Sequence, residues 1–300
     1  MTSERVQPIR PTTVEAVASR LRAAGCIFAE DEAHLLLAES SDRLELDRLV
    51  EARCSGVPLE HLLGWAEFGG RRLRVGPGVF VPRARTELLV RIGVGLLQPR
   101  LVAAGRDRVT APAATAVDLC CGCGAVGLVI AAALNRPAER DVRLYAVDID
   151  PAAVALAAVN IGGRGQVYAG DLYAPLPSRL RGQVDLVVAN APYVPTAELP
   201  FMPAEARRYE PHAALDGGPD GLDVVRRVVR EAPRWLAPNG SVIVEASRRQ
   251  VDEVCAAMHR AGLVPEVAYD EDLAATAVAG QRPARPPGDR AHTISDSGRR

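Results

Sequence analysis

Short apolar runs alternate with segments of helical length over residues 85–280, and no other feature of the sequence constrains the fold as strongly. The runs at 115–119 and 144–147 have the length of buried strands, and helical patterns at 125–134 and 151–160 follow them. Strands that alternate with helices form a parallel sheet with helices packed on both faces. The sequence therefore predicts an α/β domain with a doubly wound, mostly parallel sheet.

Seven strand candidates fall in this domain, so the expected sheet is seven-stranded. They are residues 115–119, 144–147, 166–169, 184–189, 241–245, 264–269 and 275–279. The expected helices cover residues 86–97, 125–134, 151–160, 221–235 and 249–261.

The remaining segments differ in character from this domain. Residues 1–65 predict a small helical domain, because apolar residues recur there at helical spacing behind a capping box at 12–15. Residues 66–84 place aromatic and β-branched residues among glycines, which predicts a hairpin linker. Residues 281–300 are polar and rich in proline, which predicts a disordered tail.

The charge balance argues against nucleic acid as a direct partner. The net charge is −1, and all 36 basic residues are arginine. Nucleic-acid binders usually carry a basic surplus. The sequence has no apolar run of membrane-spanning length, and its first residues are polar, so neither a membrane span nor a signal peptide is expected. We expect a cytoplasmic protein.

Three of the six cysteines cluster as Cys120, Cys121 and Cys123. Zinc sites usually combine separated pairs of ligands, and this cluster has neither a second pair nor a nearby histidine. We therefore expect no metal site. The cluster is typical of small residues at a point where the backbone passes close to a ligand.

The segment from Asp118 to Gly124 joins a predicted strand to a predicted helix. Glycines at such a turn let the backbone approach a ligand, and the helix N-terminus offers unpaired N–H groups. Residues 122–127 match G-x-G-x-x-G, a pattern that serves nicotinamide enzymes as well as methyltransferases. The pattern predicts an adenosine-containing cofactor and leaves its identity open. The candidate binding residues are Asp118, Cys120, Cys121, Gly122, Cys123 and Gly124.

Two further acidic residues lie at the ends of the next two predicted strands. Asp148 is placed to accept hydrogen bonds from both ribose hydroxyls of a cofactor. A helix N-cap is the structural alternative for this residue. Asp171 is placed to accept from an exocyclic adenine amine, and its alternative is an ordinary loop position.

The segment Asn190-Ala191-Pro192-Tyr193 follows the fourth predicted strand and favours methyl transfer over hydride transfer. An amide nitrogen is a poor nucleophile because its lone pair is delocalised into the carbonyl. Two acceptors that hold its N–H groups, the Asn190 side-chain oxygen and the Ala191 carbonyl, would orient it for attack. Pro192 restricts Ala191 to an extended conformation, and Tyr193 is placed to pack on a planar amide or base. A plain turn is the alternative.

At this point the sequence resembles the HemK-like release-factor glutamine methyltransferase family over roughly residues 55–250. Beyond the segments above, the resemblance is carried by residues 58–64 (PLEHLLG), 81–87 (VPRARTE), 209–211 (YEP), 214–218 (ALDGG) and 220–223 (DGLD). The chain departs from the family pattern in three places: Ala191 replaces a proline, Cys120 replaces the first glycine of the turn, and Arg85 replaces an acidic residue.

The resemblance implies a Rossmann-like class I methyltransferase that uses S-adenosylmethionine. It implies methylation of the glutamine amide nitrogen in the Gly-Gly-Gln tripeptide of a peptide-chain release factor. By the same resemblance, residues 120–124, Asp148, Leu172 and Asn190 line the cofactor site, residues 190–193 hold the glutamine, and the helical N-terminal part helps to receive the release factor. We expect a monomer.

Three alternatives stay open at this stage. The first is a methyltransferase that acts on amino groups of DNA, RNA or a small molecule, and the second is a non-catalytic relative that binds the cofactor or a translation factor. The third is a nicotinamide enzyme, against which residues 190–193 argue.

Overall fold

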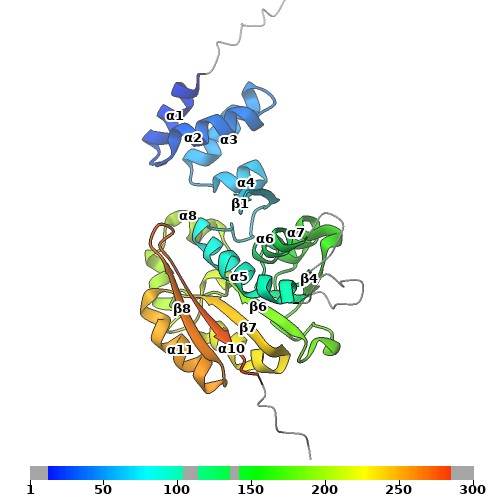
Figure 1. Cartoon of the computed structure of the whole chain (residues 1–300). Helices are drawn as coiled ribbons and strands as arrows, with labels where there is room; N and C mark the ends of the chain where they lie inside the picture. Colours follow the sequence, from blue (N-terminus) through cyan, green and yellow to red (C-terminus); the bar gives the residue numbers. More distant parts are fainter. Residues whose placement is uncertain (1–12, 104–113, 136–141, 285–300) are drawn as a thin grey trace, which may run out of the picture.

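The computed structural model describes residues 13–103, 114–135 and 142–284. Its larger part is a seven-stranded sheet, with helices on both faces, and a group of short helices lies at the N-terminal end (Figure 1). The sheet has the strand order β5-β4-β3-β6-β7-β9-β8. Its strands are β3 (Ala114–Leu119), β4 (Val142–Asp148), β5 (Gly165–Ala169), β6 (Val184–Ala189), β7 (Leu236–Glu245), β8 (Val264–Asp270) and β9 (Ala275–Gln281).

The predicted sheet is confirmed, both in its number of strands and in its mostly parallel pairing. Strands β5, β4, β3, β6 and β7 pair in parallel. Strand β9 runs antiparallel to both of its neighbours, β7 and β8.

Helices cover the sheet in two layers, each with its own hydrophobic core. Helices α5 (Glu87–Ala103), α6 (Ala125–Leu134) and α7 (Pro151–Ile161) pack on one face, and α10 (Asp223–Trp235) and α11 (Val251–Arg260) pack on the other. Successive strand residues point to opposite faces. Leu186 and Val188 accordingly join the core under α5 and α6, whereas Val187 joins the core under α10.

The topology creates a crevice at the centre of the sheet. The chain runs outward from β3 through β4 to β5, then returns to place β6 on the other side of β3. In open α/β sheets, ligands bind at the carboxyl ends of the strands where the winding direction reverses. Leu119 and Ala189 are paired at this point. The residues that follow them, Cys120 and Asn190, therefore leave the sheet side by side.

The N-terminal segment forms a separate layer of helices (Figure 1). Helices α1 (Val14–Ala23), α2 (Ala29–Glu39) and α3 (Arg43–Cys54) enclose their own small core, and the short α4 (Leu59–Leu63) follows. Strands β1 (Trp65–Phe68) and β2 (Arg71–Arg74) then form an antiparallel hairpin. This hairpin is shorter than the segment 66–84 that the sequence predicts, because residues 75–83 continue without strand pairing and lead to η1 (Ala84–Thr86).

Several boundaries differ from the sequence prediction. Helix α5 continues past Pro99 to Ala103, and α10 begins at Asp223 because Gly221 before it has a left-handed φ of +80°. Residues 196–215 contain short helices that were not predicted: η4 (Thr196–Phe201), α8 (Ala204–Tyr209) and α9 (His212–Leu215). The other short helices are η2 (Gly162–Arg164), η3 (Ser178–Leu180) and η5 (Arg248–Gln250). Gln281, at the start of the predicted tail, still belongs to β9, and residues 285–300 lie outside the described residues.

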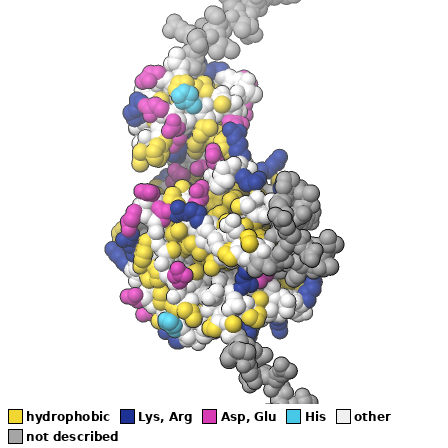
Figure 2. Space-filling view, in the orientation of Figure 1, with side chains coloured by type: hydrophobic (Ala, Val, Ile, Leu, Met, Phe, Trp, Pro, Cys, Tyr) yellow, Lys and Arg dark blue, Asp and Glu magenta, His cyan; other side chains and the backbone are white. Residues whose placement is uncertain are grey.

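Among the described residues, no helix combines the length and the apolar character that crossing a membrane requires. Figure 2 shows arginine and acidic side chains mixed over the visible face, in keeping with the net charge of −1.

Candidate active site

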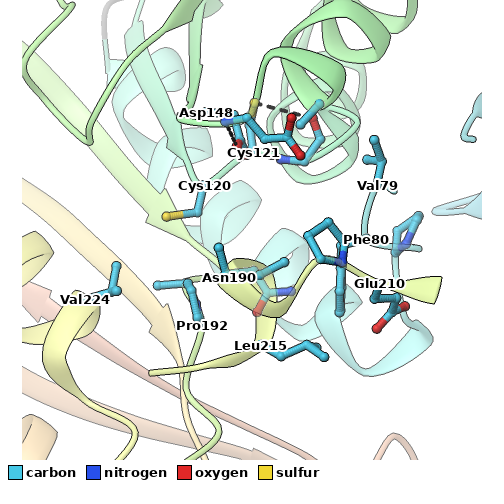
Figure 3. A pocket seen from close by; sticks show the side chains of 18 of the residues that line it. Val79, Phe80, Cys120, Cys121, Asp148, Asn190, Pro192, Glu210, Leu215 and Val224 are labelled. Atoms are coloured by element: carbon cyan, nitrogen blue, oxygen red, sulfur yellow. Dashed lines mark hydrogen bonds between the residues drawn. The ribbon is translucent and has the colours of Figure 1, made fainter. Parts of the chain in front are cut away.

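A cavity of about 760 Å³ opens at the carboxyl ends of the central strands. This volume falls in the range of small-molecule sites. Figure 3 shows Asp148 and Cys121 at one end of the cavity, Asn190 and Pro192 at the other, and Cys120 between them. The structure thus brings the two predicted groups of residues into one space. The predicted residues that line it are Asp118, Cys120, Cys121, Gly122, Cys123, Asp148, Asp171, Leu172, Asn190, Ala191, Pro192 and Tyr193.

Gly124 is the one predicted site residue that does not line this cavity. It is the N-cap of α6, with a φ of +81°. A Cβ at this position would lie 3.0 Å from the Ile161 side chain. Gly124 therefore serves the close packing of α6 against α7, which is a structural reason for glycine here.

The turn after β3 is held open by Asp148. One carboxylate oxygen of Asp148 accepts from the Gly122 N–H at 2.8 Å, and the other accepts from the Asp150 N–H at 2.9 Å. A Cβ built on Gly122 would meet no atom within 4 Å. The backbone of this turn therefore faces free space, as a cofactor-binding turn requires. Burial raises the pKa of Asp148, and the backbone N–H groups oppose that effect.

Asp148 is not the N-cap of the following helix. That position belongs to Asp150, whose side chain accepts from the Ala152 N–H. The structural alternative to the ribose role is therefore wrong in its simple form, although Asp148 does organise the turn through backbone hydrogen bonds.

Asp118 is buried at the bottom of the turn, with 1% of its surface exposed. Its carboxylate accepts from the Gly127 N–H at 2.8 Å. Burial raises the pKa of Asp118 to about 7, against the lowering effect of that hydrogen bond. The carboxylate thus titrates near neutral pH, where a nearby positive charge on a ligand favours its ionised form.

Cys120 has a left-handed backbone, with a φ of +53°. Non-glycine residues adopt this conformation at a cost of about 1 kcal/mol or more. Burial raises the pKa of the Cys123 thiol to about 12 and raises that of Cys120 strongly, so both are neutral thiols at physiological pH. Within the described residues, no group of His, Cys, Asp and Glu could hold a metal ion.

Asp171 lies at the edge of the cavity and pairs with Arg227 from α10. Leu172, the next residue, is buried and has a left-handed φ of +48°. At this end of the cavity, Asp171 therefore forms a charged rim and Leu172 forms an apolar wall.

The Asn190–Tyr193 segment leaves β6 and forms the opposite wall. The Asn190 Nδ2 group donates to the Thr86 hydroxyl at 3.3 Å, and the Tyr193 hydroxyl donates to Glu245 at 2.8 Å. Ala191 is 1% exposed. Burial, followed by the negative charge of Glu245, raises the pKa of Tyr193, so its hydroxyl stays protonated and remains a donor.

A loop between residues 216 and 223 supports this wall from behind. The Gly217 N–H donates to the Val194 carbonyl at 2.9 Å, and a Cβ on Gly221 would lie 2.3 Å from the Tyr193 carbonyl oxygen. The Gln250 side chain donates to the carbonyls of Tyr193 and Asp220. Glycine at position 221 is therefore needed for close backbone packing against the tetrapeptide.

Three residues of the site were not identified from the sequence: Thr86, Glu245 and Gln250. Glu245 ends a strand, as Asp148 does, and this position was the available signal. Thr86 lies within the segment 81–87 that the resemblance covers. Gln250 has no comparable signal.

The outer part of the cavity is lined by residues from the segments 79–85 and 202–215. Figure 3 shows Phe80 and Glu210 on this side, beyond Asn190. Glu210 pairs with Arg83, and its second carboxylate oxygen is buried without a hydrogen-bond partner in the described structure. Burial raises the pKa of Glu210, and Arg83 opposes that effect.

The sheet order, the open turn after β3 and the Asn-Ala-Pro-Tyr wall together define a class I methyltransferase. A solved structure agrees at the level of the fold: the hMettl16 catalytic domain, in complex with a MAT2A 3′UTR hairpin, superposes with a TM-score of 0.52 and 12% identity. It covers 77% of this chain, and this chain covers 81% of it. A family model described as "Methyltransferase small domain" matches residues 93–203.

Sequence relatives narrow the class to a family. The release factor glutamine methyltransferase of Mycolicibacterium smegmatis is 41% identical over 253 residues, which is 78% of this chain and 83% of the relative. The protein of the same name from Cereibacter sphaeroides is 32% identical over 273 residues, covering 83% of this chain and 90% of the relative. The chain belongs to the release factor glutamine methyltransferase family, and the predicted resemblance is confirmed.

Proposed function

We propose that this chain transfers a methyl group from S-adenosylmethionine to the side-chain amide nitrogen of the glutamine in the Gly-Gly-Gln tripeptide of a peptide-chain release factor. One observation carries the proposal: the cofactor turn and the Asn190–Tyr193 wall leave adjacent, paired strands and face one cavity. A methyl donor and an amide acceptor bound there are within reach of each other.

The residues that follow β3, β4 and β5 at the cavity would hold S-adenosylmethionine. Asp148 binds the ribose hydroxyls, because each of its carboxylate oxygens keeps a lone pair beyond the one that accepts a backbone N–H. Asp118 and the turn 120–123 bind the methionine part, and the negative charge of Asp118 attracts its ammonium group. Asp171 would accept from the exocyclic adenine amine, and Leu172 would offer the adenine an apolar contact.

The glutamine enters from the outer part of the cavity and meets Asn190. The Asn190 oxygen and the Ala191 carbonyl accept from the two N–H bonds of the glutamine amide, and Tyr193 packs beside it. Asn190 uses its own N–H to reach Thr86, which leaves its oxygen available as an acceptor.

The chemical role of the chain is to position the glutamine amide and to polarise its N–H bonds. S-adenosylmethionine, when bound, supplies a methyl group on a positively charged sulfur that leaves as a neutral thioether. The two acceptors withdraw the amide N–H bonds from the carbonyl plane, which localises the nitrogen lone pair for attack on the methyl carbon. The proton that the nitrogen loses passes to water. Orientation of this kind provides most of the acceleration in such reactions.

The residue boundaries of the functional parts are also proposed. Residues 1–65 receive the release factor, residues 66–84 connect this part to the catalytic domain, and residues 85–280 carry out the methyl transfer. Arg53 connects the first part to the cavity rim, since it pairs with Glu32 on α2 and with Glu205 on α8. We infer that the chain acts as a monomer in the cytoplasm and makes no direct use of nucleic acid.

Methyl transfer from radiolabelled S-adenosylmethionine tests this proposal. The acceptors are purified release factors, total protein and total RNA from the same organism. We expect the label on a release factor, and we expect it to be lost when the Gly-Gly-Gln glutamine is replaced by alanine. Label on RNA or on an unrelated protein would contradict the proposed substrate, and absence of label despite cofactor binding would contradict the enzymatic role.

A further inference from the structure

Behind the Asn190–Tyr193 wall lies a buried carboxylate that no part of the transfer reaction uses directly. Glu245 ends β7 and is 3% exposed. Its Oε1 accepts from the Tyr193 hydroxyl at 2.8 Å, and its Oε2 accepts from the Thr86 hydroxyl at 2.8 Å. Arg85 lies beside it, with its Nε 3.3 Å from Oε1. A buried carboxylate is costly unless it is paired, and here each oxygen has a donor.

The Thr86 hydroxyl determines which way round the Asn190 amide lies. A hydroxyl has a single proton, and Thr86 donates that proton to Glu245. Towards Asn190, Thr86 can therefore only accept. The Asn190 Nδ2 group must face Thr86, where the distance is 3.3 Å, and the Asn190 oxygen must face the cavity.

We propose that Glu245 and Thr86 are positioning residues that hold Asn190 with its acceptor oxygen towards the substrate amide. This inference rests on the proposed function, in which that oxygen accepts from the glutamine. With the amide reversed, an N–H group of Asn190 would face the N–H groups of the substrate, and two donors would oppose each other.

Arg85 determines which oxygen position of residue 245 must remain an acceptor, and with it the direction of the hydrogen bonds from residue 245 through Thr86 to Asn190. If Glu245 is replaced by glutamine, Arg85 and the Tyr193 hydroxyl both donate towards the Oε1 position and keep the carbonyl oxygen there. The new NH₂ group then faces Thr86, which must accept from it and donate to Asn190 instead. Glu245→Gln, although similar in size, is thus expected to reverse Asn190.

Thr86 offers a matched pair of variants. Thr86→Ser keeps the hydroxyl and its hydrogen bonds, whereas Thr86→Val keeps the shape and loses both bonds. Tyr193→Phe is a further comparison, because it removes one donor to Glu245 and leaves the path from Glu245 to Asn190 intact.

The test measures kcat and KM for methyl transfer to a release factor, together with S-adenosylhomocysteine affinity and the unfolding temperature. We expect kcat to fall roughly 100-fold in Thr86→Val and Glu245→Gln, as on loss of one aligned polar group at a reacting centre. Cofactor-product affinity should stay close to wild type in both variants, and Thr86→Ser should keep its activity. The unfolding temperature should stay close to wild type in Glu245→Gln and fall by a few degrees in Thr86→Val, where Glu245 Oε2 is left buried without its donor. If Thr86→Val retains wild-type kcat while Asn190→Ala is inactive, or if it stays folded but loses cofactor binding together with activity, the inference is wrong.

A second measurement does not depend on turnover. In ¹⁵N-labelled protein, the Asn190 side-chain amide signals are assigned by their loss in Asn190→Asp. We expect these signals to be preserved in Thr86→Ser and displaced in Thr86→Val and Glu245→Gln. Unchanged signals in all three variants would overturn the inference. A wild-type protein that labels no release factor would instead overturn the proposed function, and the amide signals would still report the orientation of Asn190.

Discussion

Replacement of Asp148 by alanine is expected to weaken S-adenosylmethionine binding by roughly a hundredfold. In the proposed complex the carboxylate accepts from two ribose hydroxyls. A hydrogen bond to a charged group contributes about 1.5 kcal/mol at the lower end of its range. Two such bonds give about 3 kcal/mol, which corresponds to a factor of roughly a hundred in Kd. The variant also loses the bonds that hold Gly122 and Asp150, so this figure is a lower bound.

Asp148→Asn should fall between wild type and alanine. Its amide has one oxygen and one NH₂ group, whereas both positions face backbone N–H donors. One position therefore places a donor against a donor, and we expect a rise in Kd of roughly tenfold, from loss of one of the two ribose bonds. The binding is measured by isothermal titration calorimetry.

Asp150→Ser is the matched control. Asp150 also carries a negative charge at the cavity, but its side chain caps α7 through the Ala152 N–H. Serine keeps the cap and removes the charge. The Kd should stay within about twofold of wild type, because the contact rather than the charge is what matters. A Kd for Asp148→Ala close to wild type, or an equal loss of affinity in Asp150→Ser, would show that Asp148 does not bind the ribose.

Three further variants test other parts of the site. In wild type, the affinity for S-adenosylmethionine should fall as the pH drops below 7, because the Asp118 carboxylate, whose pKa is about 7, becomes protonated. In Asp118→Asn the affinity should lose this pH dependence. A wild-type affinity that does not change with pH would contradict this role of Asp118. Because the pKa of Asp118 is raised in the folded protein, its contribution to folding stability is present below its unfolded pKa and is lost as the pH rises through 7. Without bound cofactor, Asp118→Asn should therefore unfold at a higher temperature than wild type in alkaline buffer. Gly221→Ala should lower the unfolding temperature by several degrees, because Gly221 has a φ of +80° and an alanine Cβ there would lie 2.3 Å from the Tyr193 carbonyl oxygen. An unchanged unfolding temperature would show that the loop relaxes freely. Ala191→Pro should keep methyl transfer within about threefold of wild type, because proline retains the carbonyl and the extended conformation; an inactive variant would indicate a wall rebuilt for another acceptor.

The sheet was predictable because its strands are continuous apolar runs with turns between them. Runs such as 184–189 are buried on both faces, and burial of that kind leaves a clear pattern in the sequence. The acidic residues at strand ends were predictable for the same reason, since the carboxyl ends of parallel strands share one edge.

Other parts of the structure depend on contacts between distant residues. Thr86 and Glu245 are 159 residues apart and meet only when α5 packs across the sheet. Helices α8 and α9 are too short to show a hydrophobic period. Helix α5 continues through Pro99, where a proline in the sequence favours a stop, because packing of the helix against the sheet stabilises it.

The position of the transferred methyl group shows whether Asn190 directs methyl transfer to the Gly-Gly-Gln glutamine. A release factor is incubated with S-adenosylmethionine and either wild-type protein or Asn190→Ala, and its Gly-Gly-Gln peptide is sequenced by mass spectrometry. We expect one added methyl group on the glutamine side chain with wild type and none with Asn190→Ala, although both proteins bind S-adenosylhomocysteine with similar affinity. Methylation at any other residue would contradict the proposed substrate, and equal methylation by both proteins would contradict the role of Asn190.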